Sequence, residues 1–180
     1  MSVFEIKELI EKFKAGDKRV DLNGKSVDDL ILNGLDFNFK GISARGFSAK
    51  DADLSKLKFV EMDLSGANFA DAILTGCDFS KSKLRGANFT GSDCSSVNFT
   101  GCDLTGANFY GCILSRAQFE QVEAAGVIFK GAQLADVNFY YCNLTAANMH
   151  HAKVIGTTYQ HTNLTGVIST SGKPLQEVMK

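Results

Sequence analysis

Residues 87–109 read ANFTGSDCSSVNFTGCDLTGANF, a stretch built from a unit of five residues. The same period holds over residues 52–171, where a Phe recurs every ten residues from Phe59 to Phe139. Leu occupies most of the positions midway between them, from Leu54 to Leu144. The repeating unit is therefore a quintet whose third residue alternates between Leu and Phe.

A period of five matches neither an amphipathic helix, which repeats every three to four residues, nor a strand, which repeats every two. The stretch is also rich in Gly, Ser, Thr and Asn, which favour turns over helix interiors. In each quintet the first and third residues are small or apolar, and the other three are mostly polar. This pattern predicts a solenoid in which two residues of each quintet point into a thin apolar core and three point outward.

The repeat A-(D/N)-(L/F)-x-x resembles the signature of the pentapeptide-repeat proteins, and residues 67–69, 87–89 and 107–109 carry it as Ala-Asn-Phe. The resemblance implies an all-β fold, a right-handed quadrilateral parallel β-helix with four quintets in each coil. The residues alone require only an even number of sides, because Leu and Phe alternate. Residues 8–24 are also similar to the short helix that precedes the repeats in many cyanobacterial members.

With twenty residues in each coil, side chains at the third position align in columns along the rod. Two of these columns are predicted to be aromatic ladders inside the core, where rings on successive coils can stack with an offset. The first ladder contains Phe59, Phe79, Phe99, Phe119, Phe139 and Tyr159, and the second contains Phe69, Phe89, Phe109, Phe129 and Met149.

The chain divides into three segments. Residues 1–19 are predicted to form an α-helical cap, because an apolar face at helical spacing follows Ser2, which makes a capping box with Glu5. Such a helix would cover the open apolar end of the first coil. Residues 20–171 are predicted to form the β-helix, and residues 172–180 a short C-terminal tail.

The repeat is less regular before residue 52. Its central residues are predicted to be Leu22, Val27, Leu32, Phe37, Ile42 and Phe47. Because seven residues separate Phe47 from Leu54, we expect a two-residue phase slip at Lys50 and Asp51. The extra residues would form a small bulge at one corner of the coil.

Charge and hydropathy exclude several classes of partner. The net charge of −1 argues against direct binding to nucleic acid or to an acidic membrane. No apolar run approaches the ~20 residues that cross a bilayer, and the charged N-terminal residues lack the apolar core of a secretory signal. We therefore expect a cytoplasmic protein with no membrane contact.

The cysteines and histidines do not predict a metal site. The five cysteines occupy inward positions and are expected to pack as small hydrophobic residues. His150, His151 and His161 point outward, and His151 and His161 lie half a coil apart, so they cannot share one metal ion. We expect no metal and no other cofactor.

The sequence contains no nucleophile elbow, phosphate-binding loop, dinucleotide fingerprint or pair of catalytic carboxylates. A core only two side chains wide also leaves no room for a buried ligand pocket of several hundred Å³. We therefore expect no catalytic site and no enzymatic activity.

Two functions remain open, and the first is a protein-interaction scaffold with an unidentified protein partner. Exposed Tyr is a favoured anchor at protein interfaces. Tyr110, Lys130 and His150 align at twenty-residue spacing as one candidate patch, and Tyr140 with Tyr141 forms a second.

The second function follows from the resemblance, since some pentapeptide-repeat proteins mimic DNA, bind type II topoisomerases such as DNA gyrase and confer quinolone resistance. Such a mimic needs a continuous acidic wall, because the DNA channel of its partner is basic. Residues 52–171 contain ten acidic and eight basic residues, and Lys83 interrupts the best acidic column, Asp63, Asp103 and Glu123. The family's mimics dimerise through their C-terminal ends, so the short tail predicts a monomer or a weak C-terminal homodimer.

Overall fold

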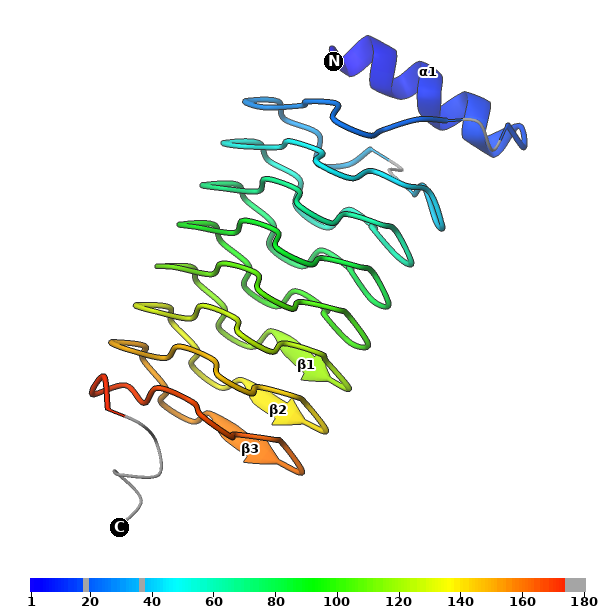
Figure 1. Ribbon diagram of the computed structural model, residues 1–180. Helices are drawn as coiled ribbons and strands as arrows, with labels where there is room; N and C mark the ends of the chain where they lie inside the picture. The colour runs from blue at the N-terminus through cyan, green and yellow to red at the C-terminus, as the bar shows by residue number, and fades with distance from the viewer. Residues whose placement is uncertain (18–19, 36–37, 174–180) are drawn as a thin grey trace.

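The computed structural model describes residues 1–17, 20–35 and 38–173 and shows a rod of stacked coils (Figure 1). Helix α1 (Val3–Lys14) lies at the N-terminal end of the rod. Three short strands lie toward the other end, namely β1 (Gln118–Glu120), β2 (Asn138–Tyr140) and β3 (Thr158–Gln160). They form one parallel sheet in the order β1-β2-β3.

Single parallel β-bridges extend this pairing along the rod. From Asn38 onward, each bridge joins residues that are twenty positions apart. Within one coil, bridges start at Asn68, Ile73, Asp78 and Lys83, at intervals of five residues. Each coil therefore has four sides of one quintet each, which confirms the predicted quadrilateral β-helix.

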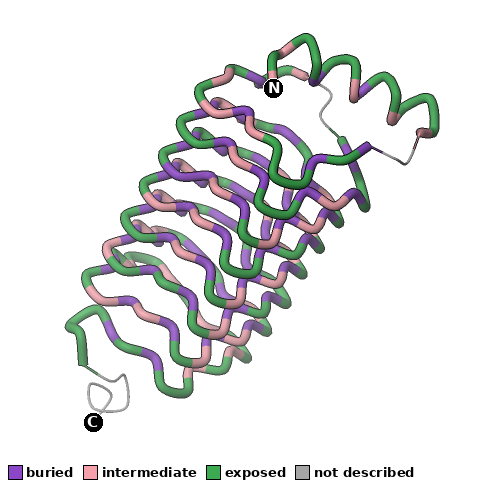
Figure 2. The backbone as a smooth tube through the Cα atoms, turned by 45° about the horizontal axis from the view of Figure 1, so that its top comes forward, coloured by how far each residue is buried: buried purple, intermediate pink, exposed green. Residues whose placement is uncertain are grey.

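The backbone turns between quintets so that two residues of each quintet stay inside. The first and third residues are buried along the regular part of the rod, while the intervening residues face solvent (Figure 2). At a typical corner the Ala67 amide donates to the Leu64 carbonyl, and Gly66 between them has a φ of +69°. A positive φ at this place is what a type II turn requires.

Both predicted aromatic ladders are confirmed, and they contact each other inside the rod. Within a ladder, most rings of successive coils stack, as Phe69 and Phe89 do with centroids 5.1 Å apart. Between ladders the rings meet edge to face, as Phe79 and Phe89 do at 6.0 Å and 89°. The two ladders therefore form one continuous aromatic core with Leu columns beside it.

Helix α1 begins as predicted, at a complete capping box. The Ser2 hydroxyl accepts a hydrogen bond from the Glu5 amide, and the Glu5 carboxylate accepts one from the Ser2 amide. Ile6 and Ile10 are buried within the same apolar cluster as the coils. Among the described residues, no helix combines the length and the apolarity needed to cross a membrane.

The phase slip predicted at Lys50 and Asp51 is wrong, because the register changes earlier in the chain. Ile31 pairs with Asp53, twenty-two residues away, whereas Asn38 pairs with Lys58, twenty residues away. The two extra residues therefore lie between Ile31 and Asn38.

The same shift moves two apolar residues out of their predicted places. Ile42 and Phe47 are buried at first positions of their quintets, and Ala44 and Ala49 are buried at the central positions. The error arises because a large side chain at the first position and a small one at the centre fill the core as well as the reverse. Phe37, a predicted centre, and the tail residues from Pro174 lie outside the described residues.

Candidate interaction surface

The first predicted patch is a column of side chains on one corner of the rod. Backbone hydrogen bonds from Gly111 to the Lys130 carbonyl and from Gly131 to the His150 carbonyl place these residues on successive coils. Tyr110 is 51% exposed. The His150 ring stacks on His151, with centroids 3.8 Å apart. Within the described ranges, no ring contact or ion pair links Tyr110, Lys130 and His150, so the column has no mutual side-chain support.

The second predicted pair belongs to a larger cluster. Tyr140 and Tyr141 pack edge to face with ring centroids 4.6 Å apart. His161, one coil further along, stacks on Tyr141 at 4.7 Å with the planes 14° apart, and its ring lies 5.8 Å from that of Tyr140. We call Tyr140, Tyr141 and His161 the aromatic corner.

The contribution of His161 could have been found from the sequence. It follows Tyr141 by twenty residues, so the coil length alone places it on the next coil at the same corner. Among the residues that the structure describes, no three His, Cys, Asp or Glu side chains converge as a metal site.

The backbone presents the aromatic corner at the ends of β2 and β3. Tyr140 is the last residue of β2, and the Tyr141 amide donates to the Gln160 carbonyl at 3.0 Å. Tyr141 and His161 both have a φ of +53°. This left-handed conformation costs roughly 1–2 kcal/mol for a residue other than Gly, so the fold holds two bulky rings where Gly would be favoured.

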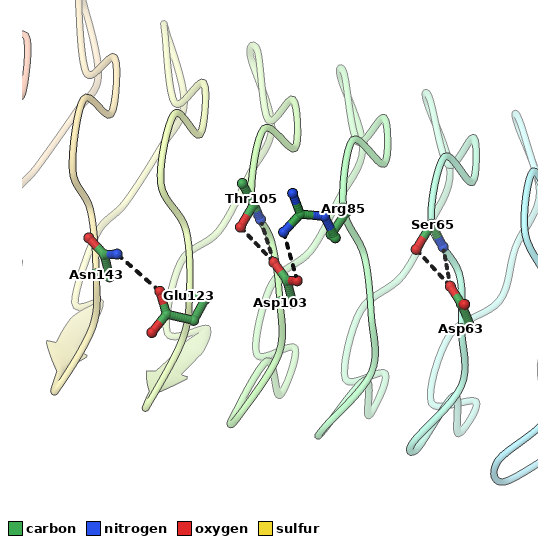
Figure 3. A network of polar contacts seen from close by, with 7 residues as sticks. All are labelled: Asp63, Ser65, Arg85, Asp103, Thr105, Glu123 and Asn143. Carbon is green, nitrogen blue, oxygen red and sulfur yellow. Dashed lines mark hydrogen bonds and ion pairs between the residues drawn. The ribbon is translucent and has the colours of Figure 1, made fainter.

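Two carboxylates lie beside the aromatic corner on the preceding coil. Glu120 pairs with Tyr140 in the register of β1 and β2. Glu123 follows the same corner, and its Oε2 accepts a hydrogen bond from Asn143 Nδ2 at 3.0 Å (Figure 3). Partial desolvation, together with Tyr141 and the Glu120 carboxylate, raises the pKa of Tyr140.

A shallow depression of about 350 Å³ adjoins the aromatic corner on the outer face of β1 and β2. Its lining includes the side-chain amides of Gln118 and Asn138, the Tyr140 ring, and the charged residues Arg116, Glu120 and Asp136. The depression therefore offers both amide groups and charges of either sign to a bound chain.

The predicted acidic column exists, but basic residues pair with two of its three carboxylates, Asp63 and Asp103. Asp63, Asp103 and Glu123 lie on one wall, as Figure 3 shows. Asp103 Oδ2 is 3.1 Å from Arg85 Nη1, and Asp63 Oδ2 is 3.8 Å from Arg45 Nη1. This wall is a pattern of alternating charges and does not form a continuous acidic surface.

The five thiols are buried and free, as predicted, and most of them also donate hydrogen bonds. Cys77, Cys102 and Cys142 each lie within 3.1 Å of a main-chain carbonyl of the preceding coil, namely those of Leu54, Phe79 and Phe119. Burial raises the pKa of Cys77 and Cys102 to about 12. These thiols therefore serve the packing of coils and lack the exposure of a reactive site.

Two family models match the chain. The model described as pentapeptide repeat region matches residues 92–168, and the model of pentapeptide repeats (8 copies) matches residues 50–86. Together the two matches cover most of the regular repeat. No curated protein matches the chain.

Several solved structures of pentapeptide-repeat proteins are similar to the chain. A protein of the Arabidopsis thaliana thylakoid lumen is 25% identical, with a TM-score of 0.49 over 65% of this chain and 66% of that one. HetL of Nostoc sp. strain PCC 7120, which is involved in heterocyst differentiation regulation, is 18% identical, with a TM-score of 0.29 over 94% and 98% of the two chains.

Full-length QnrB1, a plasmid-mediated fluoroquinolone resistance protein, is 17% identical, with a TM-score of 0.34 over 79% of this chain and 90% of that one. The chain thus matches about two thirds of the length of the plant protein and larger shares of the other two. None of these likenesses identifies a partner for this chain.

Proposed function

The chain belongs to the pentapeptide-repeat family, and from this premise we propose that it is a non-catalytic scaffold that binds a protein partner through the aromatic corner. The observation that carries the proposal is the mutual packing of Tyr140, Tyr141 and His161 on the outside of the rod. Tyr141 is 54% exposed although it packs against both other rings. Exposed aromatic rings of this kind are the anchors that dominate many protein interfaces.

The rod supports this role because it fixes the three rings before any partner arrives. The corner is tied to its neighbours by the β1-β2-β3 pairing and by the aromatic ladder of Phe119, Phe139 and Tyr159 inside the rod. Rings that are already ordered lose little conformational entropy on binding.

The packing of the core supports a non-catalytic role. Phe and Leu side chains fill the interior, so the depression beside the aromatic corner lies on an outer wall. A water-excluding active site needs a more enclosed setting.

We further propose that α1 caps the N-terminal end of the core. Ile6 and Ile10 are buried in the apolar cluster of the coils, and the Phe13 ring meets Phe39 edge to face at 5.4 Å. A solenoid exposes apolar surface at each end unless a different element covers it. Deleting residues 1–14 should therefore lower the denaturation midpoint and promote association of the rods.

Mimicry of DNA is not the function that we favour. Arg85 and Arg45 pair with Asp103 and Asp63 on the wall that holds the predicted acidic column. Duplex DNA presents uniform negative charge to a basic channel, and a wall of alternating sign offers no such match. A gyrase supercoiling assay with added protein should accordingly show neither inhibition nor protection from a quinolone.

Site-specific photo-crosslinking in the native cell tests the scaffold proposal. A photoreactive phenylalanine analogue at position 141 should give a discrete crosslinked product with the partner. Position 81 is the matched control, because Lys81 is exposed at the same corner of the coil with a similar backbone conformation, three coils away. The control should give no such product.

The yield of the crosslinked product at position 141 should also fall when Tyr140 and His161 are replaced by Ala. If positions 140, 141 and 161 all give no product in a protein that remains folded by circular dichroism, the aromatic corner is not an interface. Equal products at positions 81 and 141 would show adventitious labelling and would also overturn the proposal.

A further inference from the structure

We propose that the aromatic corner receives a cationic side chain of its protein partner, an arginine or a lysine held over tyrosine and between the carboxylates of Glu120 and Glu123. This inference rests on the proposed function and names the chemistry of the partner segment. It depends on the arrangement of charge around the three rings.

The two carboxylates lie on the coil that precedes Tyr140 and Tyr141. Glu120 pairs directly with Tyr140 across β1 and β2, and paired residues of neighbouring strands place their side chains about 5 Å apart on one face. Glu123 bridges to Asn143, on the other side of the corner. The rings therefore lie close to one carboxylate on each of two adjoining walls.

Neither carboxylate is neutralised by a base within the part of the chain that the structure describes. Glu123 accepts its hydrogen bond from the neutral amide of Asn143, and Glu120 has no ion pair. The pattern differs at Asp63 and Asp103, which have Arg45 and Arg85 as partners. Negative charge is thus left uncompensated beside a corner that also exposes aromatic rings.

The adjoining depression is consistent with the same partner. It contains Arg116 as well as Glu120 and Asp136, and no ion pair joins Arg116 to either acid among the described residues. Counting Glu123, three carboxylates face one guanidinium around this site. The balance is negative, so the site favours a cationic segment over an acidic one.

Aromatic rings and carboxylates recognise a cation by different means that act together. A guanidinium or ammonium group within about 6 Å of a tyrosine face is attracted by the ring quadrupole. A carboxylate beside the ring adds a charge-assisted hydrogen bond to the same group. Arginine suits the site best, because its planar head can stack on a ring while its N–H groups reach a carboxylate.

The inference is tested with the full chain and three fluorescent peptides of otherwise identical Gly/Ser sequence that carry three Arg, three Lys or three Glu residues. Anisotropy titrations should show binding of the Arg peptide, weaker binding of the Lys peptide and no binding of the Glu peptide. The affinity for the Arg peptide should fall about tenfold in the double variant E120Q/E123Q, as the loss of two charge contacts predicts.

A matched variant separates the site from general electrostatics. D63N/D103N removes the same number of charges from carboxylates that already have arginine partners, and it should leave the affinity for the Arg peptide within about twofold. Y140A/Y141A should weaken binding of the Arg peptide to a similar extent as E120Q/E123Q. In NMR spectra of the wild-type protein, the Tyr ring resonances should shift on titration with the Arg peptide.

The inference is overturned if the Arg peptide does not bind, if the Glu peptide binds as well, or if E120Q/E123Q and D63N/D103N weaken binding equally. If the Arg peptide does not bind but position 141 still gives a specific crosslink, only the cationic partner is refuted. If neither the binding nor the crosslink is observed, the scaffold proposal is refuted as well.

Discussion

The phenyl rings of Phe89 and Phe109 lie face to face, with centroids 4.6 Å apart and planes only 1° from parallel. Their separation is close to the distance of about 4.8 Å between neighbouring strands, because twenty residues of chain bring each ring directly over the last. Phe99 of the other ladder meets both rings edge to face, at 5.8 and 5.6 Å. Each central ring is therefore held from above, from below and from the side.

The first prediction concerns this aromatic packing. Phe99→Ala should lower the free energy of unfolding by about 3–5 kcal/mol, because a fully buried ring is lost and the rigid coils above and below restrict collapse of the cavity. Guanidinium denaturation followed by circular dichroism measures the change. Phe99→Leu keeps most of the volume and should cost less. An unchanged midpoint for Phe99→Ala would contradict the inward position of this ring.

The second prediction concerns the thiols. No thiol should react with Ellman's reagent at pH 8 in the native protein, because all five cysteines are buried and burial raises the pKa of Cys77 and Cys102 to about 12. In guanidinium all five thiols should react. Rapid release of one equivalent or more of the reagent's coloured thiolate by the native protein would contradict the burial of the cysteines between packed coils. Cys102→Ser should be tolerated, since Ser82, at the equivalent position one coil earlier, donates the same kind of hydrogen bond to the Phe59 carbonyl.

The sequence was sufficient to predict those features that depend on strict periodicity or on a local motif. The two ladders follow from the ten-residue recurrence of Phe59 to Phe139, and the capping box follows from Ser2 and Glu5 alone. The interior position of the cysteines follows from the same period. Their hydrogen bonds to main-chain carbonyls depend on distances between coils, which no one-dimensional pattern contains.

The register of residues 38–49 could not be predicted by placing the largest apolar residues at quintet centres. Ile42 and Phe47 are large but lie at first positions, where Ala or Cys is usual, and Ala44 and Ala49 take the centres. Core volume is conserved when large and small residues exchange between the two inward positions. Of the aromatic corner, the sequence predicted the pair Tyr140 and Tyr141 but not the stacking of His161 on Tyr141.

The third prediction concerns Asp103. Partial burial opposes its ionisation, but hydrogen bonds from the Thr105 hydroxyl and amide and from Arg85 prevail and lower its pKa. Since the folded pKa lies below the unfolded value of about 3.9, the carboxylate stabilises the fold above that pH. This stability is lost as the pH falls through the folded pKa.

Two variants separate the charge of Asp103 from its hydrogen bonds to the turn. Asn143 accepts the equivalent bonds from Thr145, so D103N should keep the turn and lose only the pairing with Arg85. Its cost at pH 7 should be about 0.5–1 kcal/mol and should decrease as the pH falls through the folded pKa of Asp103. D103A should cost more throughout this range. A D103N deficit that does not depend on pH would show that the charge has no role.

The last prediction concerns His150, whose ring stacks on His151 beside Lys130. Partial desolvation, followed by the charges of His151 and Lys130, lowers the pKa of His150 below its ordinary value of 6.5. The unfolded chain therefore takes up its proton first as the pH falls through 6.5, and protonation of His150 opposes folding. An NMR titration of the imidazole resonances should give a midpoint below 6.5 for His150. K130M should raise that midpoint, because it removes a neighbouring cation and keeps a side chain of similar length. A midpoint at or above 6.5, or one that K130M leaves unchanged, would show that solvent screens these three side chains from one another.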